Sequence, residues 1–258
     1  MKVIFTGTGE AFDEHLPNCS VWIEAHGNEG KKSLLLDCGF CAPFSYWRNV
    51  KNPLDLDGLW ISHFHGDHFF GTPALLLRFW EEGRTKPLTV LGQTGVQEKI
   101  FQAMDMAYPG FRRKMAFAVN FIEVSANKNI SALGLDFGFA ETEHSQTNLA
   151  VRVDDNAASV FYSGDGRPTD ATLDLAQGCD LIIHEAFRIE PDTPGHGTVQ
   201  GALDFARKAG ANTLALVHVQ RDVRRGRHDE IMKLLQETKD LKAVLPKPGD
   251  MLEIGAPG

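Results

Sequence analysis

The chain has 258 residues, of which 43% are hydrophobic and 23% are charged, as is typical of a soluble globular protein. Its formal net charge of -8 excludes a strong overall attraction to nucleic acid or to an anionic membrane, so nucleic-acid binding would need a local basic patch. No apolar run reaches membrane-spanning length, and the chain begins with a strand pattern at Val3-Ile4-Phe5 rather than with a signal peptide. We therefore expect a cytoplasmic protein that does not bind membranes.

The first sixty residues predict a run of β-strands separated by glycine turns. Apolar stretches at 3–5, 20–24 and 33–37 have the composition of strands. Thr6-Gly7-Thr8-Gly9 is a weak phosphate-loop signal, because neither a Gly-Lys-Ser/Thr sequence nor a dinucleotide fingerprint follows it. Asp37 ends the third strand. It is either a simple turn carboxylate or a group that holds a metal-ligand imidazole by its other nitrogen.

The densest chemical signal is His63-Phe64-His65-Gly66-Asp67-His68, in which three histidines and a carboxylate fall within six positions. The apolar run 58–61 before it predicts a buried strand, and the pattern after it predicts a helix with Pro73 near its start. The ligand-type residues therefore lie on a turn between a strand and a helix, where Gly66 allows the chain to turn tightly. Imidazole together with carboxylate predicts a site for zinc, iron, manganese or nickel.

Further ligand-type residues follow predicted strands in the second half of the chain, namely His144, Asp165 and His218. The spacing of apolar residues predicts helices at 96–106, 170–177, 199–208 and 229–238. His196 precedes one of these helices and does not follow a buried strand. That position suits a mobile general acid better than a metal ligand, and the alternative is a residue that merely neighbours a helix cap.

Strands, a histidine-rich turn and a helix occur in each half of the chain, and no linker separates the halves. We expect one domain over residues 1–258, with halves of about 1–135 and 136–258. The simplest packing is an α+β sandwich of two mixed β-sheets flanked by helices.

The ligand-type residues at predicted strand ends are His63, His65, Asp67, His68, His144, Asp165 and His218. Seven are too many for one ion, so we divide them into two groups. His63, His65 and His144 would hold one metal, Asp67, His68 and His218 a second, and Asp165 would bridge them. Two metals roughly 3.5–4 Å apart can share a bridging hydroxide and lower the pKa of water to about 7 for attack at phosphorus.

This pattern resembles the metallo-β-lactamase superfamily over nearly the whole chain, and within it most closely ribonuclease Z and related zinc phosphodiesterases. Besides the histidine motif, the segments that carry the resemblance are Thr6-Gly7-Thr8-Gly9, Leu36-Asp37-Cys38-Gly39, Tyr162-Ser163-Gly164-Asp165-Gly166-Arg167-Pro168, Ile183-His184-Glu185-Ala186 and His196-Gly197-Thr198. The resemblance implies an αββα fold and two divalent metal ions, zinc first, with iron or manganese as alternatives. It also implies that Asp67 orients the hydroxide, that His196 protonates the leaving oxygen and that Glu185 supports His196.

The chain departs from bacterial ribonuclease Z where that family carries a long arm for gripping transfer RNA. Only twenty residues separate His144 from Asp165, which is enough for a hairpin and no arm. His218 is followed by Val219-Gln220-Arg221 instead of the family's Phe-Ser. These departures leave open whether RNA is processed.

The leading functional hypothesis is a dinuclear metal-dependent phosphodiesterase that acts on RNA or on small cyclic or linear phosphodiesters. One alternative is a thioester or lactone hydrolase with the same site, and another is a metal-binding sensor with little turnover. The basic run Arg221–His228 is either a solvated surface or a phosphate-gripping segment. The partner is therefore a phosphodiester or other ester-type substrate, and the oligomeric state stays open between monomer and homodimer.

Overall fold

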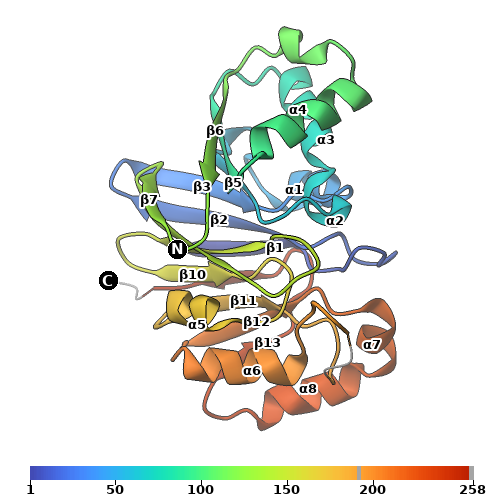
Figure 1. The fold of residues 1–258 in the computed structure, drawn as a ribbon, viewed down its shortest axis with the longest axis vertical. Helices are drawn as coiled ribbons and strands as arrows, with labels where there is room; N and C mark the ends of the chain where they lie inside the picture. Colours follow the sequence, from blue (N-terminus) through green and yellow to red (C-terminus); the bar gives the residue numbers. More distant parts are fainter. Residues whose placement is uncertain (191–192, 256–258) are drawn as a thin grey trace.

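The computed structural model describes residues 1–190 and 193–255, in which two seven-stranded β-sheets pack face to face with helices on both outer faces (Figure 1). Each sheet contains both parallel and antiparallel neighbours. The predicted α+β sandwich with two mixed sheets is confirmed.

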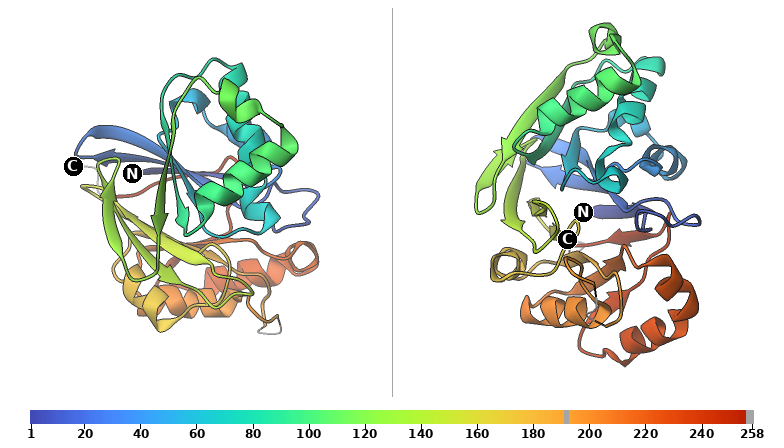
Figure 2. Two further views of the ribbon diagram at one scale, coloured as in Figure 1. Left: turned by 45° about the horizontal axis from the view of Figure 1, so that its top comes forward. Right: turned by 45° about the vertical axis from the view of Figure 1, so that its right-hand side comes forward.

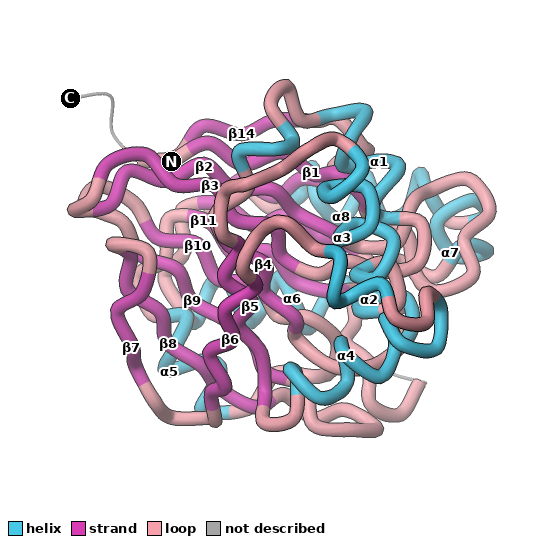
Figure 3. The backbone as a smooth tube through the Cα atoms, turned by 90° about the horizontal axis from the view of Figure 1, so that it is seen from above, coloured by secondary structure: helices cyan, strands magenta, loops and turns pink. Residues whose placement is uncertain are grey.

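The first sheet comprises, in order across it, β14 (Met251–Glu253), β1 (Lys2–Gly7), β2 (Ser20–Gly27), β3 (Gly30–Leu36), β4 (Gly58–Ile61), β5 (Leu88–Gln93) and β6 (Val119–Val124). The second sheet comprises, in order, β13 (Lys242–Val244), β12 (Thr213–Val217), β11 (Leu181–Glu185), β10 (Ser159–Tyr162), β9 (Leu149–Asp154), β8 (Leu135–Glu141) and β7 (Asn129–Ala132). After β6 the chain crosses from the first sheet to the second, and β14 returns to the edge of the first sheet. Figure 3 shows β4, β5 and β6 side by side, with β7, β8 and β9 beyond them.

The helices divide between the two outer faces, as both views in Figure 2 show. The helices over the first sheet are α1 (Ala42–Asn49), α2 (Gly66–Phe69), α3 (Thr72–Glu81) and α4 (Val96–Ala107), with short 3₁₀ turns at Pro53–Asp55 and Phe111–Lys114. Those on the side of the second sheet are α5 (Asp170–Ala176), α6 (Val199–Lys208), α7 (Arg221–Gly226) and α8 (His228–Glu237). No helix in residues 1–190 or 193–255 has the length and apolar character needed to cross a membrane.

Helix α1 corrects the expectation that residues 1–60 contain only strands. Pro43 stands in its first turn, where a missing backbone N–H costs nothing. Tyr46 is buried on its inner face and donates a hydrogen bond from its hydroxyl to the carbonyl of Pro53 (2.6 Å). The helix has only eight residues, too few for its apolar spacing to stand out from that of a strand.

The largest layer of the core lies between the sheets and draws on both. Trp60 of β4 and Phe139 of β8 stack with ring centroids 5.0 Å apart, and Phe5 and Tyr162 belong to the same buried cluster. Two further clusters fill the spaces between each sheet and its own helices. The inner face of each sheet is therefore buried only against the other sheet.

Because each sheet buries its inner face against the other sheet, we propose that residues 1–258 unfold as one domain. The four tryptophans, Trp22, Trp47, Trp60 and Trp80, all lie in the first half, and Trp60 also stacks on Phe139. Their fluorescence therefore reports the first half and its contact with the second. Circular dichroism reports both halves. In a urea titration we expect the two signals to change at one common midpoint. Separate midpoints would contradict a single cooperative unit.

Candidate metal centre

Seven ligand-type side chains from five segments meet at one edge of the two sheets. His63 and His65 follow β4, Asp67 and His68 lie in α2, and His144, Asp165 and His218 follow β8, β10 and β12. Strands β3, β4 and β5 run parallel, as do β10, β11 and β12, so the segments after them emerge at the same edge. Residues up to 155 positions apart in sequence, from His63 to His218, thus share one small volume.

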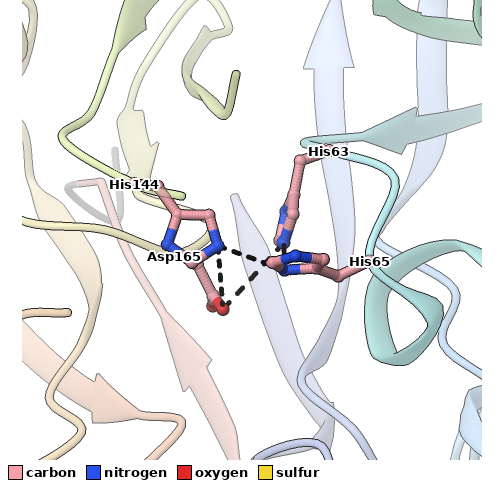
Figure 4. Close-up of side chains that lie close together, drawn as sticks. All are labelled: His63, His65, His144 and Asp165. Atoms are coloured by element: carbon pink, nitrogen blue, oxygen red, sulfur yellow. Dashed lines mark hydrogen bonds and ion pairs between the residues drawn. The ribbon is translucent and has the colours of Figure 1, made fainter. Parts of the chain in front are cut away.

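The first group consists of His63, His65, His144 and Asp165, whose potential ligand atoms all lie within 4.8 Å of one another (Figure 4). His65 Nδ1 lies 3.0 Å from His63 Nε2 and 3.1 Å from His144 Nε2. The outer nitrogens of the two flanking rings are occupied, since His144 Nδ1 donates to the carbonyl of Gly195 (2.7 Å) and His63 Nδ1 lies 3.0 Å from the Ser62 hydroxyl. This assignment of protons leaves the inner nitrogens of His63 and His144 as lone pairs directed at one point.

The second group consists of Asp67, His68, Asp165 and His218, all buried. His68 Nε2 lies 3.3 Å from Asp67 Oδ2 and 3.2 Å from Asp165 Oδ1, and His218 Nε2 lies 3.2 Å from Asp67 Oδ2. The two oxygens of Asp165 divide between the groups. Oδ1 faces His68 and His218, whereas Oδ2 lies 4.0 Å from both His63 and His144. The division agrees with the bridging position expected for Asp165.

The electrostatics of the cluster call for positive charge at its centre. Burial lowers the pKa of His63 well below its ordinary value. Burial also opposes charge on His218, but Asp165 and Asp67 outweigh it and raise the pKa of His218 to about 9. The carboxylates likewise outweigh burial at His68 and raise its pKa well above the ordinary value. At Asp165 burial opposes ionisation, but the imidazoles of His218 and His68 outweigh it and lower the pKa of the carboxyl well below its ordinary value. Buried carboxylates are stable only beside a cation, whether it is a protonated imidazole or a metal ion.

The donor set fits a divalent metal. Two buried atoms of the second group, His68 Nε2 and Asp165 Oδ1, have no hydrogen-bond partner, although buried polar atoms are nearly always paired. Both point into the cluster, where a cation would satisfy them. Imidazole nitrogen and carboxylate oxygen are ligands for zinc, iron and manganese.

Asp37 fixes the second group from behind. Its carboxylate, fully buried, accepts hydrogen bonds from the Ser62 amide (2.8 Å), the Ser62 hydroxyl (2.7 Å) and the Tyr162 hydroxyl (2.7 Å), and it faces His68 Nδ1 at 2.7 Å. The Ser62 hydroxyl in turn faces His63 Nδ1 (3.0 Å). One carboxylate therefore contacts His68 directly and His63 through Ser62. These contacts favour the role of holding a ligand imidazole by its other nitrogen over that of a simple turn carboxylate.

We expect Asp37→Asn to lower metal affinity by roughly 10–100-fold, because this buried carboxylate holds His68 in the orientation and tautomer that point Nε2 inward. Competition with a chromogenic chelator measures the change. Thermal unfolding in the presence of excess metal serves as the control for folding. Unchanged affinity would mean that the Asp37–His68 contact does not position the ligand.

His196 lies beside both groups without belonging to either four-residue set. Its ring centroid is 5.1 Å from that of His144 and 5.9 Å from that of His218, and its Nδ1 faces Glu185 Oε1 at 3.1 Å. Glu185 is fully buried and accepts amide hydrogen bonds from Gly166 (2.9 Å), Phe187 (3.0 Å) and Gly197 (2.9 Å). A fixed carboxylate thus orients an imidazole whose side chain is still 19% exposed, as a proton donor to substrate requires.

The basic run after His218 forms helix α7 and pairs with acids of the loop between β1 and β2. Arg221 Nη1 donates to Glu10 Oε1 (2.7 Å), Arg224 Nε donates to Asp13 Oδ2 (3.1 Å), and Arg225 Nη2 donates to Glu14. Each of the three arginines therefore has an acidic partner, and the choice between a solvated surface and a phosphate-gripping segment stays a prediction. The sequence contained no signal for the pairs, because acids and arginines are 211 positions apart.

A cavity of about 540 Å³ opens onto the metal centre. His196 and several residues of the centre line it, together with aromatic side chains that carried no signal in the sequence. The aromatic residues are Phe12, Phe40, Phe70 and Phe187. Phe187 stacks on His196, with ring centroids 4.5 Å apart and an interplanar angle of 25°.

Known proteins resemble this chain in sequence and in fold. A sequence model of the family described as "Anti-Pycsar protein Apyc1" matches residues 1–240. Ribonuclease BN of Escherichia coli (strain K12 / MC4100 / BW2952) is 28% identical over 273 residues, an alignment that covers 85% of this chain and 89% of the relative.

Two solved structures show the same fold. The metallo-β-lactamase fold protein YhfI from Bacillus subtilis has a TM-score of 0.78 and 24% identity, and the match covers 98% of this chain and 99% of that chain. The short form of human tRNase Z has a TM-score of 0.79 and 20% identity, with coverage of 99% and 100%. The expected metallo-β-lactamase fold and the resemblance to ribonuclease Z are confirmed.

Proposed function

Because this chain belongs to the anti-Pycsar protein Apyc1 family and has the metallo-β-lactamase fold, we propose that it hydrolyses phosphodiesters. The chain is a metal-dependent hydrolase, and the proposal concerns its substrate class and the roles of its residues. The observation that carries the proposal is Asp165, whose two oxygens face two separate groups of ligand atoms.

The residues that would hold metal are the two groups around Asp165. His63, His65 and His144 would hold one ion, Asp67, His68 and His218 would hold the other, and Asp165 would contact both. Zinc is our first choice, with iron or manganese as alternatives, because all three accept imidazole and carboxylate ligands. When bound, a pair of such ions supplies an activated water and neutralises charge on the phosphoryl oxygens.

The chain's own residues complete the reaction. The carboxylate of Asp67 orients the attacking water, which enters opposite the leaving oxygen. His196 donates its proton to that oxygen as the P–O bond breaks. Glu185 holds the imidazole in place for the transfer.

Three observations support a small phosphodiester over transfer RNA. The net charge is -8, the arginines of α7 are engaged with Glu10, Asp13 and Glu14, and only twenty residues lie between His144 and Asp165. An RNA-binding surface normally neutralises several phosphates with lysine and arginine. We therefore place cyclic and short linear phosphodiesters ahead of RNA, although ribonuclease BN and tRNase Z carry RNA-directed names.

Elemental analysis of the purified protein combined with a substrate panel tests the proposal. The panel contains bis(p-nitrophenyl) phosphate, 3′,5′-cyclic nucleotides, short RNA, a thioester and a lactone, each with zinc, manganese or iron. We expect phosphodiester turnover that chelation and His65→Ala abolish. Turnover of the thioester or lactone alone, or metal binding with no turnover of any substrate, would overturn the proposed class.

We also place the enzyme in the cytoplasm, where thiols stay reduced. All four cysteines are free, and three of them, Cys19, Cys38 and Cys179, are buried. Fractionation of the native host followed by immunodetection tests this location. Recovery from a secreted fraction would contradict it.

A further inference from the structure

Exposed aromatic side chains gather at the cavity of the metal centre. Among the described residues, seven large hydrophobic side chains are exposed, and three of them line this one cavity: Phe12 (76% exposed), Phe40 (47%) and Phe70 (55%). They come from three segments, namely the loop between β1 and β2, the turn after β3 and the end of α2. A cluster of this kind, with polar residues around it, marks a binding surface.

Two of the rings are fixed to the helix that carries Asp67 and His68. The turn that bears Phe40 lies directly on α2, because the Cys38 amide donates to the His68 carbonyl (2.8 Å). A Cβ atom at Gly39 would lie 1.9 Å from the Asp67 carbonyl oxygen, so only glycine permits this approach. Phe70 directly follows α2, and its ring lies over Gly66. The backbone at Phe40 and Phe70 is therefore tied to the helix that carries two of the metal-ligand candidates.

The third ring is carried by the loop that helix α7 holds. The Phe12 amide donates to Glu10 Oε2 (2.8 Å), while Glu10 Oε1 accepts from Arg221. On the other side of Phe12, the fully buried Asp13 side chain accepts from Arg224 and from the amides of His15 (2.9 Å) and Leu16 (3.1 Å). Phe12 is exposed on a loop that charged pairs fix on both sides of it.

Resting on the phosphodiesterase function proposed above, we propose that Phe12, Phe40 and Phe70 form a subsite for a planar aromatic group of the substrate, such as a nucleobase. Glu10 and Asp13, with Arg221 and Arg224, act as positioning residues that hold Phe12 there. The same cavity contains Asp67, Asp165, His196 and His218, so one small molecule can place its phosphodiester at the metals and its ring at the aromatic rim. Aromatic rings stack on the π face of a base. Such a subsite therefore does not depend on which hydrogen-bonding groups the base carries at its edge.

The test compares Phe12→Ala with the wild type on two substrates that differ only in the ring. One is adenosine 3′,5′-cyclic phosphate, and the other is the 3′,5′-cyclic phosphate of methyl ribofuranoside, which has no base. We expect KM for the adenosine substrate to rise by roughly 5- to 150-fold, the equivalent of stacking worth about 1–3 kcal/mol, with kcat nearly unchanged. KM for the base-free substrate should stay the same.

Phe44→Ala is the matched control. Phe44 is 72% exposed on α1 and does not line the cavity, so its removal should leave both KM values unchanged. If Phe12→Ala raises both KM values equally, or neither, the subsite is overturned. A change in oligomeric state by light scattering without a change in KM would make the rings an interface between copies, and would also overturn it.

A binding measurement separates this proposal from the function on which it rests. Calorimetric titration with adenosine 5′-monophosphate needs no turnover, and we expect Phe12→Ala to weaken its binding in the same range. Binding that depends on Phe12, with no hydrolysis of any phosphodiester, would overturn the function and keep the subsite. Hydrolysis of both cyclic phosphates with no dependence on Phe12 would overturn the subsite and keep the function.

A double-mutant cycle tests the positioning role of Arg224. We expect Arg224→Ala to raise KM for the adenosine substrate alone, and to add little once Phe12 is alanine. An equal rise for the base-free substrate would mean that Arg224 grips the phosphate, which contradicts its role here. Because Arg224→Ala leaves the Asp13 carboxylate buried without its guanidinium, Arg224→Lys is the second variant, and it should recover part of the wild-type KM.

Discussion

Asp165→Ala should remove both metal ions from the protein and lower kcat/KM by about 10³-fold or more. Asp165 is the only residue common to the two four-residue groups in the described chain, and its side chain is 3% exposed. Its loss takes one ligand from each group. It also leaves Asp67 as the one carboxylate facing the inner nitrogens of His68 and His218, while Asp37 stays at the outer nitrogen of His68. The metals contribute several kcal/mol to the transition state, and each 1.36 kcal/mol corresponds to a factor of ten in rate.

Elemental analysis after gel filtration measures this loss directly, with about two ions expected per wild-type chain and fewer than one per variant chain. Asp165→Asn keeps the shape of the side chain but not its charge, and it should show the same loss to a lesser degree. Asp229→Ala, an exposed acid in the first turn of α8, is the control and should retain full metal content. If Asp165→Ala binds two ions as tightly as the wild type, the bridging assignment is wrong.

His196→Ala should lower kcat by about 10²- to 10⁴-fold while the metal content stays unchanged. The imidazole lies within 6 Å of the rings of His144 and His218 but outside both four-residue groups, and Glu185 orients it. A general acid matters most when the leaving oxygen is a poor leaving group. The loss should therefore be large for a nucleoside leaving group and much smaller for p-nitrophenolate.

This dependence on the leaving group distinguishes a proton donor from a structural residue, because damage to folding would affect both substrates alike. His26→Ala, an exposed histidine in β2, is the control and should have no effect. Equal losses for the two leaving groups, or a loss of metal in His196→Ala, would remove His196 from the role of acid. His196 would then count as a metal-site residue. Its potential ligand atoms form a third cluster with those of Glu185 and His218.

Local sequence was informative wherever neighbouring residues decide the structure. Helix α6 begins and ends where the apolar spacing and Gly210 predict, and Thr169 caps α5 as expected. The histidine motif could be located because four ligand-type residues are close in sequence and stay close in space. Tyr162 carried no such signal, since its hydroxyl reaches Asp37 across 125 positions.

The backbone conformation of two site residues could not be predicted from the sequence either. Asp37 has φ 61° and His218 has φ 56°, in the left-handed region that few residues other than glycine adopt. The contacts that hold these residues come from distant strands and loops. The Asp37 carboxylate binds Ser62, and the His218 amide donates to the Thr8 carbonyl (3.0 Å). Local propensity would favour other conformations at both positions.

The sequence by itself determined the fold class and showed which residues have the chemistry to hold metal, and it predicted that they divide into two groups. The first two results depend on periodicity and on residue type, which are local properties. Only the tertiary structure decided that the arginines of α7 pair with acids of the loop between β1 and β2, and that Phe12, Phe40 and Phe70 share a cavity with the metal centre. Contacts between distant segments arise when the two sheets close on a common core, and no pattern along the chain records which exposed side chains then become neighbours.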